Sequence, residues 1–248
     1  MNVIGIYIIG DEILSGKRED KHLSQAIQIL KDRGLALAWA NYLGDDPAKL
    51  TASFRRSFAT TDIVFSFGGI GATPDDYTRL AAADALSIAI ERHADAVLEI
   101  EAQFGEGAYP KRVLMADFPK GAALIPNPIN RVAGFSVGSH YFLPGFPQMA
   151  WPMMEWVLDT HYQHLFHTQT TTEVSIKIFE VGESQLIDLM NAILQKYPAI
   201  KLFSLPSLSP KKLIELGLKG DLAICQQAMG EIQAYLNMHQ MKWQTLDN

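Results

Sequence analysis

The sequence predicts an α/β fold, in which a mostly parallel β-sheet is covered by helices on both faces, followed by a small α+β domain. Apolar runs such as 3–9 and 62–67 are typical of strands that are buried on both faces. Stretches with apolar residues at helical spacing follow these runs, and this alternation indicates βαβ units with parallel pairing. Because such crossovers are right-handed, we expect helices on both sides of the sheet.

The elements of the first domain follow these two patterns in order along the chain. The first helix is predicted from Leu23, Ala26 and Leu30, which share one face, and Gly34 ends it. The other predicted strands are 35–42, 122–125, 134–137 and 140–143, and the other predicted helices are 47–58, 78–86, 91–104 and 147–159. Gly138-Ser139 separates the last two strands, which predicts an antiparallel hairpin.

A domain boundary is predicted in the polar stretch 161–172, where neither spacing continues. We therefore expect one domain over 1–167 and a second over 168–248. Strands and helices of the second domain are predicted in the order βαββα, at 173–178, 183–196, 199–205, 214–220 and 221–236. His161, His164 and His167 are evenly spaced in the boundary stretch, but we expect a linker there rather than a zinc site.

Composition and charge exclude several classes of protein. The 248 residues include 27 acidic and 21 basic side chains, for a formal net charge of −6, and no cluster of Lys and Arg. Nucleic acid is therefore not expected as a partner. Cys225 is the only cysteine, which excludes an intrachain disulfide and a multi-cysteine zinc site. The first residues lack the basic region of a signal peptide, and no run reaches about 18 apolar residues, so we expect a cytoplasmic protein without membrane contact.

The strongest chemical signal is the glycine cluster that follows the strand at 62–67. Ligands of open parallel sheets bind beyond the carboxyl ends of the strands, where this loop must lie. Gly68, Gly69 and Gly71 allow backbone N–H groups to approach an anion closely, and Thr73 adds a hydroxyl donor. The carboxylates Asp75 and Asp76 then suit a divalent cation that bridges to the anion. Alternatively, the segment is a tight turn in which Asp76 caps the next helix.

Three further loops also connect a strand to a helix. Gly10 to Gly16 carries Asp11, Glu12 and Ser15, which are candidates for metal or ligand binding or, alternatively, solvated surface residues. The other two loops are Gly44-Asp45-Asp46, in which Asp46 is a candidate helix cap, and Pro144-Gly145-Phe146-Pro147, which alone is a rigid turn. Since such loops meet at one edge of a parallel sheet, we expect a pocket for a negatively charged ligand there.

Some side chains outside these loops have simpler expected roles. His22 and His93 are expected on exposed helix faces, and Cys225 on a buried, unreactive one. An apolar group in the helix after Pro147 is expected to pack in the core or to form a subunit contact; it comprises Met149, Trp151, Met153, Met154 and Trp156. A homo-oligomer, dimer or trimer, is expected.

Together, GDEILSG, GGIGATPDDYT and LPGFPQM resemble motifs of the molybdopterin-binding domain family (MoaB/MogA-like), and in particular the N-terminal region of the competence/damage-inducible CinA proteins. The resemblance covers about residues 1–160 and implies a three-layer αβα fold with an anionic ligand at the glycine loop. The tail is similar to the small domain that follows in CinA-type chains, and the deamidase domain that ends full-length CinA proteins is not expected here.

The resemblance also implies roles for individual residues. MogA-type relatives attach adenylate to molybdopterin with a divalent metal, whereas CinA-type domains are associated with hydrolysis of a nucleotide diphosphate such as ADP-ribose. Asp76 and Asp45 match the family's aspartates and, with Asp75, are expected to hold Mg²⁺ or Co²⁺; Gly145 matches the turn on the pterin side. Asp11 or Glu12 is expected to orient ligand or water. The remaining ligand-binding residues are expected to be Gly68, Gly69, Gly71, Thr73, Ser15 and Pro144.

These expectations define an enzyme that acts on a phosphoanhydride of a phosphorylated small molecule, either molybdopterin or a nucleotide. The alternatives are a protein that binds this ligand without turning it over, and a vestigial pocket combined with partner contacts by the tail. Two loops depart from the family pattern, at 17–22 and at Asn130-Arg131-Val132-Ala133-Gly134, where the family usually has G-T-A-P-G. Both loops are expected to contact the organic part of the ligand. Lys17, Arg18 and Arg131 are candidates for additional phosphate contacts.

Overall fold

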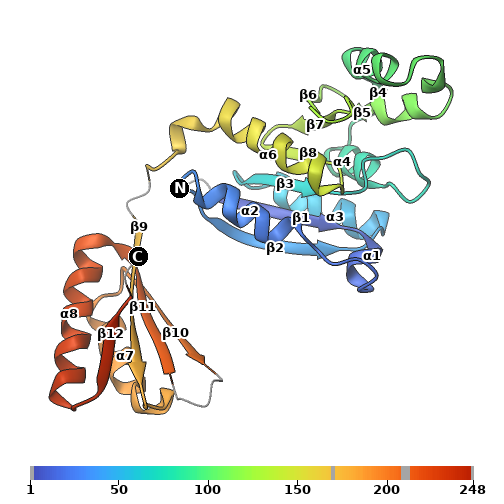
Figure 1. Cartoon of the computed structure of the whole chain (residues 1–248). Coiled ribbons are helices and arrows are strands. Elements are labelled where there is room, and N and C mark those ends of the chain that lie inside the picture. Colours follow the sequence, from blue (N-terminus) through green and yellow to red (C-terminus); the bar gives the residue numbers. More distant parts are fainter. Residues whose placement is uncertain (1–2, 169–170, 208–212, 247–248) are drawn as a thin grey trace. The chain divides into compact units, whose positions relative to one another are not determined.

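The computed structural model describes residues 3–168, 171–207 and 213–246. The chain divides into two compact units, Met1–Thr168 and Gln169–Asn248, and each contains a β-sheet of its own (Figure 1). In the described ranges, no helix has the length and apolar character that a membrane crossing requires.

A six-stranded sheet lies at the centre of the first unit, with the strand order β2-β1-β3-β8-β7-β6. Its strands are β1 (Ile4–Ile9), β2 (Leu37–Leu43), β3 (Ile63–Phe67), β6 (Ala123–Ile125), β7 (Gly134–Val137) and β8 (His140–Leu143). β2, β1, β3 and β8 are parallel, whereas β7 is antiparallel to both of its neighbours, and β7 and β8 form the predicted hairpin. β6 therefore runs in the direction of β8, so the loops that follow β1, β2, β3, β6 and β8 all leave from the same edge of the sheet.

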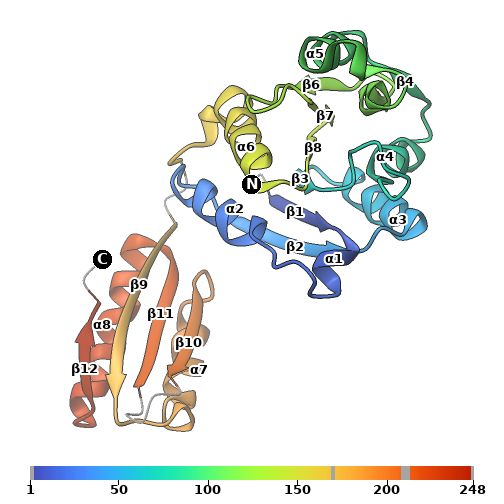
Figure 2. The same ribbon diagram turned by 45° about the vertical axis from the view of Figure 1, so that its right-hand side comes forward.

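Helices cover both faces of this sheet, as Figure 2 shows. They are α1 (Asp11–Leu14), α2 (His22–Lys31), α3 (Pro47–Phe58), α4 (Thr78–Leu86), α5 (Ala94–Phe104) and α6 (Pro147–His161), with short 3-10 turns η1 (Gly105–Ala108), η2 (Arg112–Ala116) and η3 (Gln163–Leu165). One core cluster joins α2 and α6 to Ile6 and Ile8 of β1, and a second joins α3, α4 and α5 to Tyr7 and Ile9. The alternating residues of β1 thus pack into different layers, and the predicted α/β fold class is confirmed.

Two predictions about local structure in this unit are wrong. β4 (Ile90–Arg92) pairs with β5 (Asp117–Pro119) in a separate two-stranded sheet, so the helix predicted from residue 91 begins only at Ala94. The polar stretch from residue 161 is not a linker at its start, because Tyr162, Leu165 and Phe166 pack against the core. Among the described residues, no group of three or more His, Cys, Asp or Glu side chains can hold a metal ion. The three histidines of this stretch therefore do not form such a group.

The second unit is a four-stranded antiparallel sheet with two helices. Its elements are β9 (Thr171–Phe179), η4 (Glu183–Gln185), α7 (Ile187–Lys196), β10 (Lys201–Ser207), β11 (Leu213–Asp221), α8 (Leu222–Met238) and β12 (Lys242–Thr245). The predicted βαββα order is present, and β12 adds a strand that pairs with β9 at the edge of the order β10-β11-β9-β12. Cys225 is buried in the core of this unit, and burial raises the pKa of its thiol, which leaves it protonated and unreactive.

Candidate functional site

Five loops meet at the edge of the first sheet where β1, β2, β3, β6 and β8 end. They line one pocket with a volume of about 480 Å³. The predicted site residues that line it are Glu12, Asp45, Gly68, Gly69, Gly71, Thr73, Asp75, Asp76, Pro144 and Gly145. Asp11 and Ser15 are exposed and are not part of the lining. The loops therefore converge as the parallel topology predicts, and they bring most of the candidate residues together.

The loop after β3 turns sharply because its glycines adopt conformations that other residues avoid. Gly68 and Gly69 have φ values of +105° and +70°, in the region that favours glycine. The buried Thr78 at the start of α4 fixes this turn: its hydroxyl donates to the Gly68 carbonyl at 2.9 Å, and its N–H donates to the Gly69 carbonyl at 3.0 Å. Thr78 therefore holds the loop from the side of α4, and the loop residues line the pocket.

Four consecutive N–H groups in this loop have no acceptor within the described part of the chain. They belong to Gly69, Ile70, Gly71 and Ala72, all of which line the pocket. Main-chain donors are nearly always paired in folded proteins, so water or ligand oxygens must satisfy these groups. A row of unpaired amides at a glycine turn is an arrangement that binds anions.

Asp76 interacts with its own loop. Its Oδ2 accepts the Thr73 N–H at 2.9 Å and also the Thr73 hydroxyl. The alternative in which Asp76 caps α4 is wrong, because Tyr77 occupies the N-cap position and no side chain caps the helix. The Thr73 hydroxyl, predicted to donate to the anion, donates to Asp76 instead.

Asp45 follows β2 and exchanges two hydrogen bonds with Asp11. The Asp11 N–H donates to Asp45 Oδ2 at 2.9 Å, and the Asp45 N–H donates to Asp11 Oδ1 at 3.3 Å. Partial burial raises the pKa of the Asp45 carboxyl, and the nearby Asp11, Glu12 and Asp75 carboxylates raise it further. Asp46, in contrast, caps α3 through bonds from Ala48 and Lys49, as predicted.

Arg79, for which the sequence predicts no role, ties the glycine loop to the segment that contains Leu114 and Asp117. Its guanidinium donates to the carbonyls of Gly71, Leu114 and Asp117. Burial lowers the pKa of Arg79 from its ordinary value, but an arginine remains protonated near neutral pH. The only sequence signal is a basic residue in the first turn of the helix after the glycine loop. Two of its three acceptors, the carbonyls of Leu114 and Asp117, are far away in the chain.

The prediction that His22 is exposed is wrong, because its side chain is buried. Its ring stacks on Phe67 at a centroid distance of 4.6 Å, and Nε2 lies 3.2 Å from the Gly145 carbonyl oxygen. Burial lowers the pKa of His22, so the imidazole is neutral near pH 7 and donates from Nε2 to that carbonyl. His22 therefore holds the Pro-Gly-Phe-Pro turn against the start of α2.

The pocket lining combines a set of apolar side chains, called here the apolar wall, with a set of charged side chains. The apolar wall contains Phe104, Met115, Val132, Phe146 and Met149. The charged residues of the lining are Glu12, Asp45, Asp75, Asp76 and Arg18. The Arg18 guanidinium lies 3.7 Å from Glu12. Of the other basic candidates, Lys17 is outside the lining and Arg131 pairs with Glu99 at 2.7 Å. The lining therefore carries more carboxylates than cations.

The carboxylates expected to hold a metal do not form a complete metal site by themselves. Asp45, Asp75 and Asp76 line the same pocket, but no group of three acidic or histidine side chains in the described ranges is close enough to bind an ion. In addition, Oδ2 of Asp76 is occupied by two hydrogen bonds from Thr73. A metal held only by these protein groups does not fit the arrangement.

Comparison with known proteins identifies the family of this chain. A family model described as "Probable molybdopterin binding domain" matches residues 5–164. The chain is 28% identical to a CinA-like protein of Citrifermentans bemidjiense over 95% of its length and 58% of the relative's. It is 31% identical to a CinA-like protein of Anaeromyxobacter sp. (strain K) over 77% of the chain and 48% of the relative. The chain thus spans about half the length of these curated relatives.

A solved structure gives the same result for the fold. The protein CinA of Thermoplasma acidophilum, described as having unknown function, superposes with a TM-score of 0.58 and 25% identity, over 64% of this chain and 98% of the other. The matched residues 5–164 contain every loop of the pocket. The chain therefore belongs to the family of probable molybdopterin-binding domains.

Proposed function

We propose that the pocket binds the phosphate groups of a nucleotide or of a phosphorylated pterin, and that the protein hydrolyses a phosphoanhydride bond of this ligand. The observation that carries the proposal is the row of unpaired N–H groups from Gly69 to Ala72 in the same pocket as the apolar wall. The amides suit phosphate oxygens, and the apolar side chains suit a flat ring. The family's description as molybdopterin binding supports a pterin as one of the candidates.

The charge of the pocket indicates that the ligand arrives with a cation. Glu12, Asp45, Asp75 and Asp76 outnumber the single Arg18, so a bare pyrophosphate would be repelled. Mg²⁺ is commonly bound by one or two carboxylates together with substrate phosphates and water, so it does not need three protein ligands. We propose Mg²⁺ or Co²⁺ as the companion ion, held from the protein side by Asp45 with Asp75 or Asp76.

Hydrolysis requires a water molecule that attacks one phosphorus atom. The new P–O bond forms as the bond to the bridging oxygen breaks. ADP-ribose would give two phosphate monoesters, and GDP would give GMP and inorganic phosphate. Glu12 is the better candidate to accept the water's proton, because it lines the pocket whereas Asp11 does not. The amides of Gly69 and Gly71 stabilise charge on the phosphate oxygens. Nucleotidyl transfer to a pterin needs the same parts, with a ligand hydroxyl or phosphate in place of water.

A second function, binding without turnover, is favoured by one observation. Asp76 is engaged by Thr73 and is therefore not free to hold an ion without breaking two hydrogen bonds. A carrier or sensor of the same ligand needs the amide row and the apolar wall but no mobile carboxylate.

Calorimetric titration with ADP-ribose and with GDP, in Mg²⁺ and in EDTA, tests the proposal. We expect binding that depends on Mg²⁺, with products detected by phosphorus NMR. Asp76→Asn should reduce turnover at least about 100-fold, on the scale of one electrostatic contribution. The matched control is Asp84→Asn on an exposed position of α4 outside the pocket. Binding without products supports the carrier alternative, and no binding of either ligand rejects a nucleotide as the ligand.

We also propose self-association as a dimer or trimer in the cytoplasm. Its support is the exposure of large apolar side chains on the first unit, such as Leu98 at 62% and Leu80 at 52%. Light scattering coupled to size-exclusion chromatography measures the subunit number, and a monomer at all concentrations rejects the proposal.

A further inference from the structure

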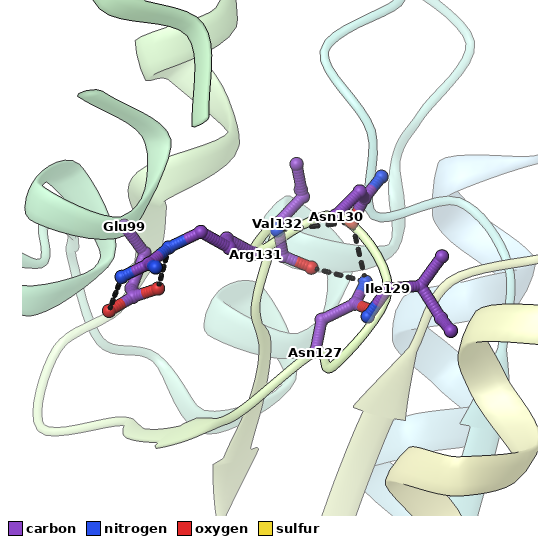
Figure 3. A network of polar contacts seen from close by, with 6 residues as sticks. All are labelled: Glu99, Asn127, Ile129, Asn130, Arg131 and Val132. Carbon is purple, nitrogen blue, oxygen red and sulfur yellow. Dashed lines mark hydrogen bonds and ion pairs between the residues drawn. The ribbon is translucent and has the colours of Figure 1, made fainter. Parts of the chain in front are cut away.

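The loop between β6 and β7 is closed by a hydrogen-bond network around Asn127 (Figure 3). Asn127 is buried, and its Oδ1 accepts the Ile129 N–H at 3.0 Å. Its Nδ2 donates to the Val132 carbonyl at 2.9 Å and to Asn130 Oδ1 at 2.8 Å. Asn130 Oδ1 also accepts the Val132 N–H at 3.1 Å. The loop thus has few internal degrees of freedom.

This network leaves only one orientation for the Asn130 amide. The Asn127 amide cannot be flipped, because one end faces a backbone donor, the Ile129 N–H, and the other faces a backbone acceptor, the Val132 carbonyl. The Asn130 atom that faces Asn127 Nδ2 and the Val132 N–H must then be the oxygen. Its Nδ2 is turned to the other side, and it has no acceptor within the described ranges.

The free amide group of Asn130 borders the pocket. Asn130 lines the cavity together with its neighbour Val132, whereas Arg131, with φ of +59°, is directed to Glu99 on α5 and pairs with it at 2.7 Å. Figure 3 shows this ion pair on the opposite side of the loop from Asn130. The loop is therefore anchored from both sides, and Asn130 brings to the pocket lining an amide whose N–H₂ group is not used within the described part of the chain.

We propose that Asn130 is a specificity-determining residue that donates to an exocyclic oxo oxygen of the ligand's ring, and so selects a guanine- or pterin-type ring over adenine. The inference rests on the proposed function, because it assigns the ring end of that same ligand. Guanine presents oxygen and nitrogen acceptors side by side, at O6 and N7. Adenine presents an amino donor at the equivalent position, which would face the Asn130 donor.

The chemistry of Asn130 also explains why the preference has this direction. A free asparagine recognises adenine by accepting from the amino group and donating to the ring nitrogen. Here Oδ1 is already used twice within the loop, so only the donor half of the amide remains for the ligand. A ring edge that presents hydrogen-bond acceptors is therefore complementary to the free N–H₂ group of Asn130.

The experiment compares GDP with ADP by calorimetric titration of the full chain in Mg²⁺. We expect the wild type to bind GDP about tenfold or more tightly, the discrimination typical of one well-placed polar contact. Asn130→Asp keeps an oxygen for both loop donors and replaces only the free N–H₂ by an acceptor. It should bring the ratio of the two dissociation constants to about one or below. The ratio is the readout because the added charge weakens both ligands alike.

Glu99→Gln is the matched control, since it removes the ion pair behind the loop and leaves Asn130 in place. It should preserve the wild-type ratio. Equal affinity of the wild type for GDP and ADP, or an unchanged ratio in Asn130→Asp, overturns this inference while the proposed function stands. Failure of both nucleotides to bind to the wild type rejects a nucleotide as the ligand of the proposed function and overturns this inference with it.

Discussion

At the scale of single residues, Asp45 combines an acidic environment with partial exposure, and this makes it pH-sensitive. Its pKa is raised above the ordinary 3.8, mainly by desolvation. The folded protein therefore binds the proton more tightly than the unfolded chain does, so ionisation of Asp45 lowers stability as pH rises through the raised pKa. The same ionisation is required to attract a cation. Ionisation of Asp45 thus lowers the stability of the fold but favours cation binding.

The first prediction follows from this opposition. In wild type, Mg²⁺-dependent binding of GDP should weaken as pH falls through the raised pKa of Asp45, at a pH above 3.8. Asp45→Asn should bind more weakly at pH 7 and should not show this step. Its melting temperature should equal or slightly exceed that of wild type at pH 7. Titration calorimetry and thermal melts between pH 4 and 8 measure both effects, and the same pH step in the variant contradicts the assignment.

A second prediction concerns Gly71. A Cβ added there would lie 2.5 Å from Asp76 Oδ2, the far end of a side chain that is able to move. Gly71→Ala should therefore displace the Asp76 carboxylate, weaken nucleotide binding about tenfold and change the free energy of unfolding by only about 1 kcal/mol. Gly230→Ala is the control, because its added methyl meets nothing within 4 Å, and it should leave binding unchanged. Unaltered binding in Gly71→Ala would show that Asp76 does not act on the ligand.

At the scale of elements, Arg79 joins the loop before α4 to η2 and β5, which are remote in sequence. Arg79→Met keeps the aliphatic stem but leaves the carbonyls of Gly71, Leu114 and Asp117 without this donor. We expect a loss of about 2–3 kcal/mol in the free energy of unfolding, together with weaker ligand binding. Urea denaturation measures the first effect. Leu80→Met is the control, since this neighbouring side chain is 52% exposed, and equal stability of the two variants contradicts the role of Arg79.

The elements that the sequence predicts correctly are those with a strong local pattern. The helix predicted at 78–86 matches α4, and the hairpin at 134–143 matches β7 and β8. β4, β5 and β12 were missed because their segments (IER, DFP and KWQT) carry no apolar or alternating pattern and depend on partners elsewhere in the chain. His22 was predicted to be exposed because its contacts, Phe67 and Gly145, come from other strands and loops.

The candidate site also has features that the sequence predicts and features that it does not. Parallel topology was enough to predict that the glycine loop, Asp45 and Gly145 share one pocket. Hydrogen bonds between side chains could not be predicted, and they decide the details: Thr73 occupies Asp76, and Asn127 fixes Asn130. Both hydrogen bonds require side chains to be placed to within a few tenths of an ångström, and no sequence spacing encodes that precision.

At the scale of the whole molecule, each of the two units contains a hydrophobic core, and the pocket is lined only by residues of the first. Leu216→Ala in β11 removes a fully buried side chain from the core of the second unit. We expect a destabilisation of about 2–5 kcal/mol there and no change in GDP affinity at a temperature where both units are folded. Thermal melts followed by titration measure this, and a parallel loss of affinity would show that the second unit contributes to the pocket.

The position of β6 at the margin of the first sheet has a consequence for how new ligand preferences could arise. The glycine loop is attached to β3 in the interior of the sheet, whereas the loop of Asn130 is attached to the outermost strand. Residues 128–132 can therefore be exchanged without rebuilding the central layer. Under the proposed function, ring recognition and phosphate binding belong to different strands, so grafting this short segment between relatives is a direct route to changing which compound the protein accepts.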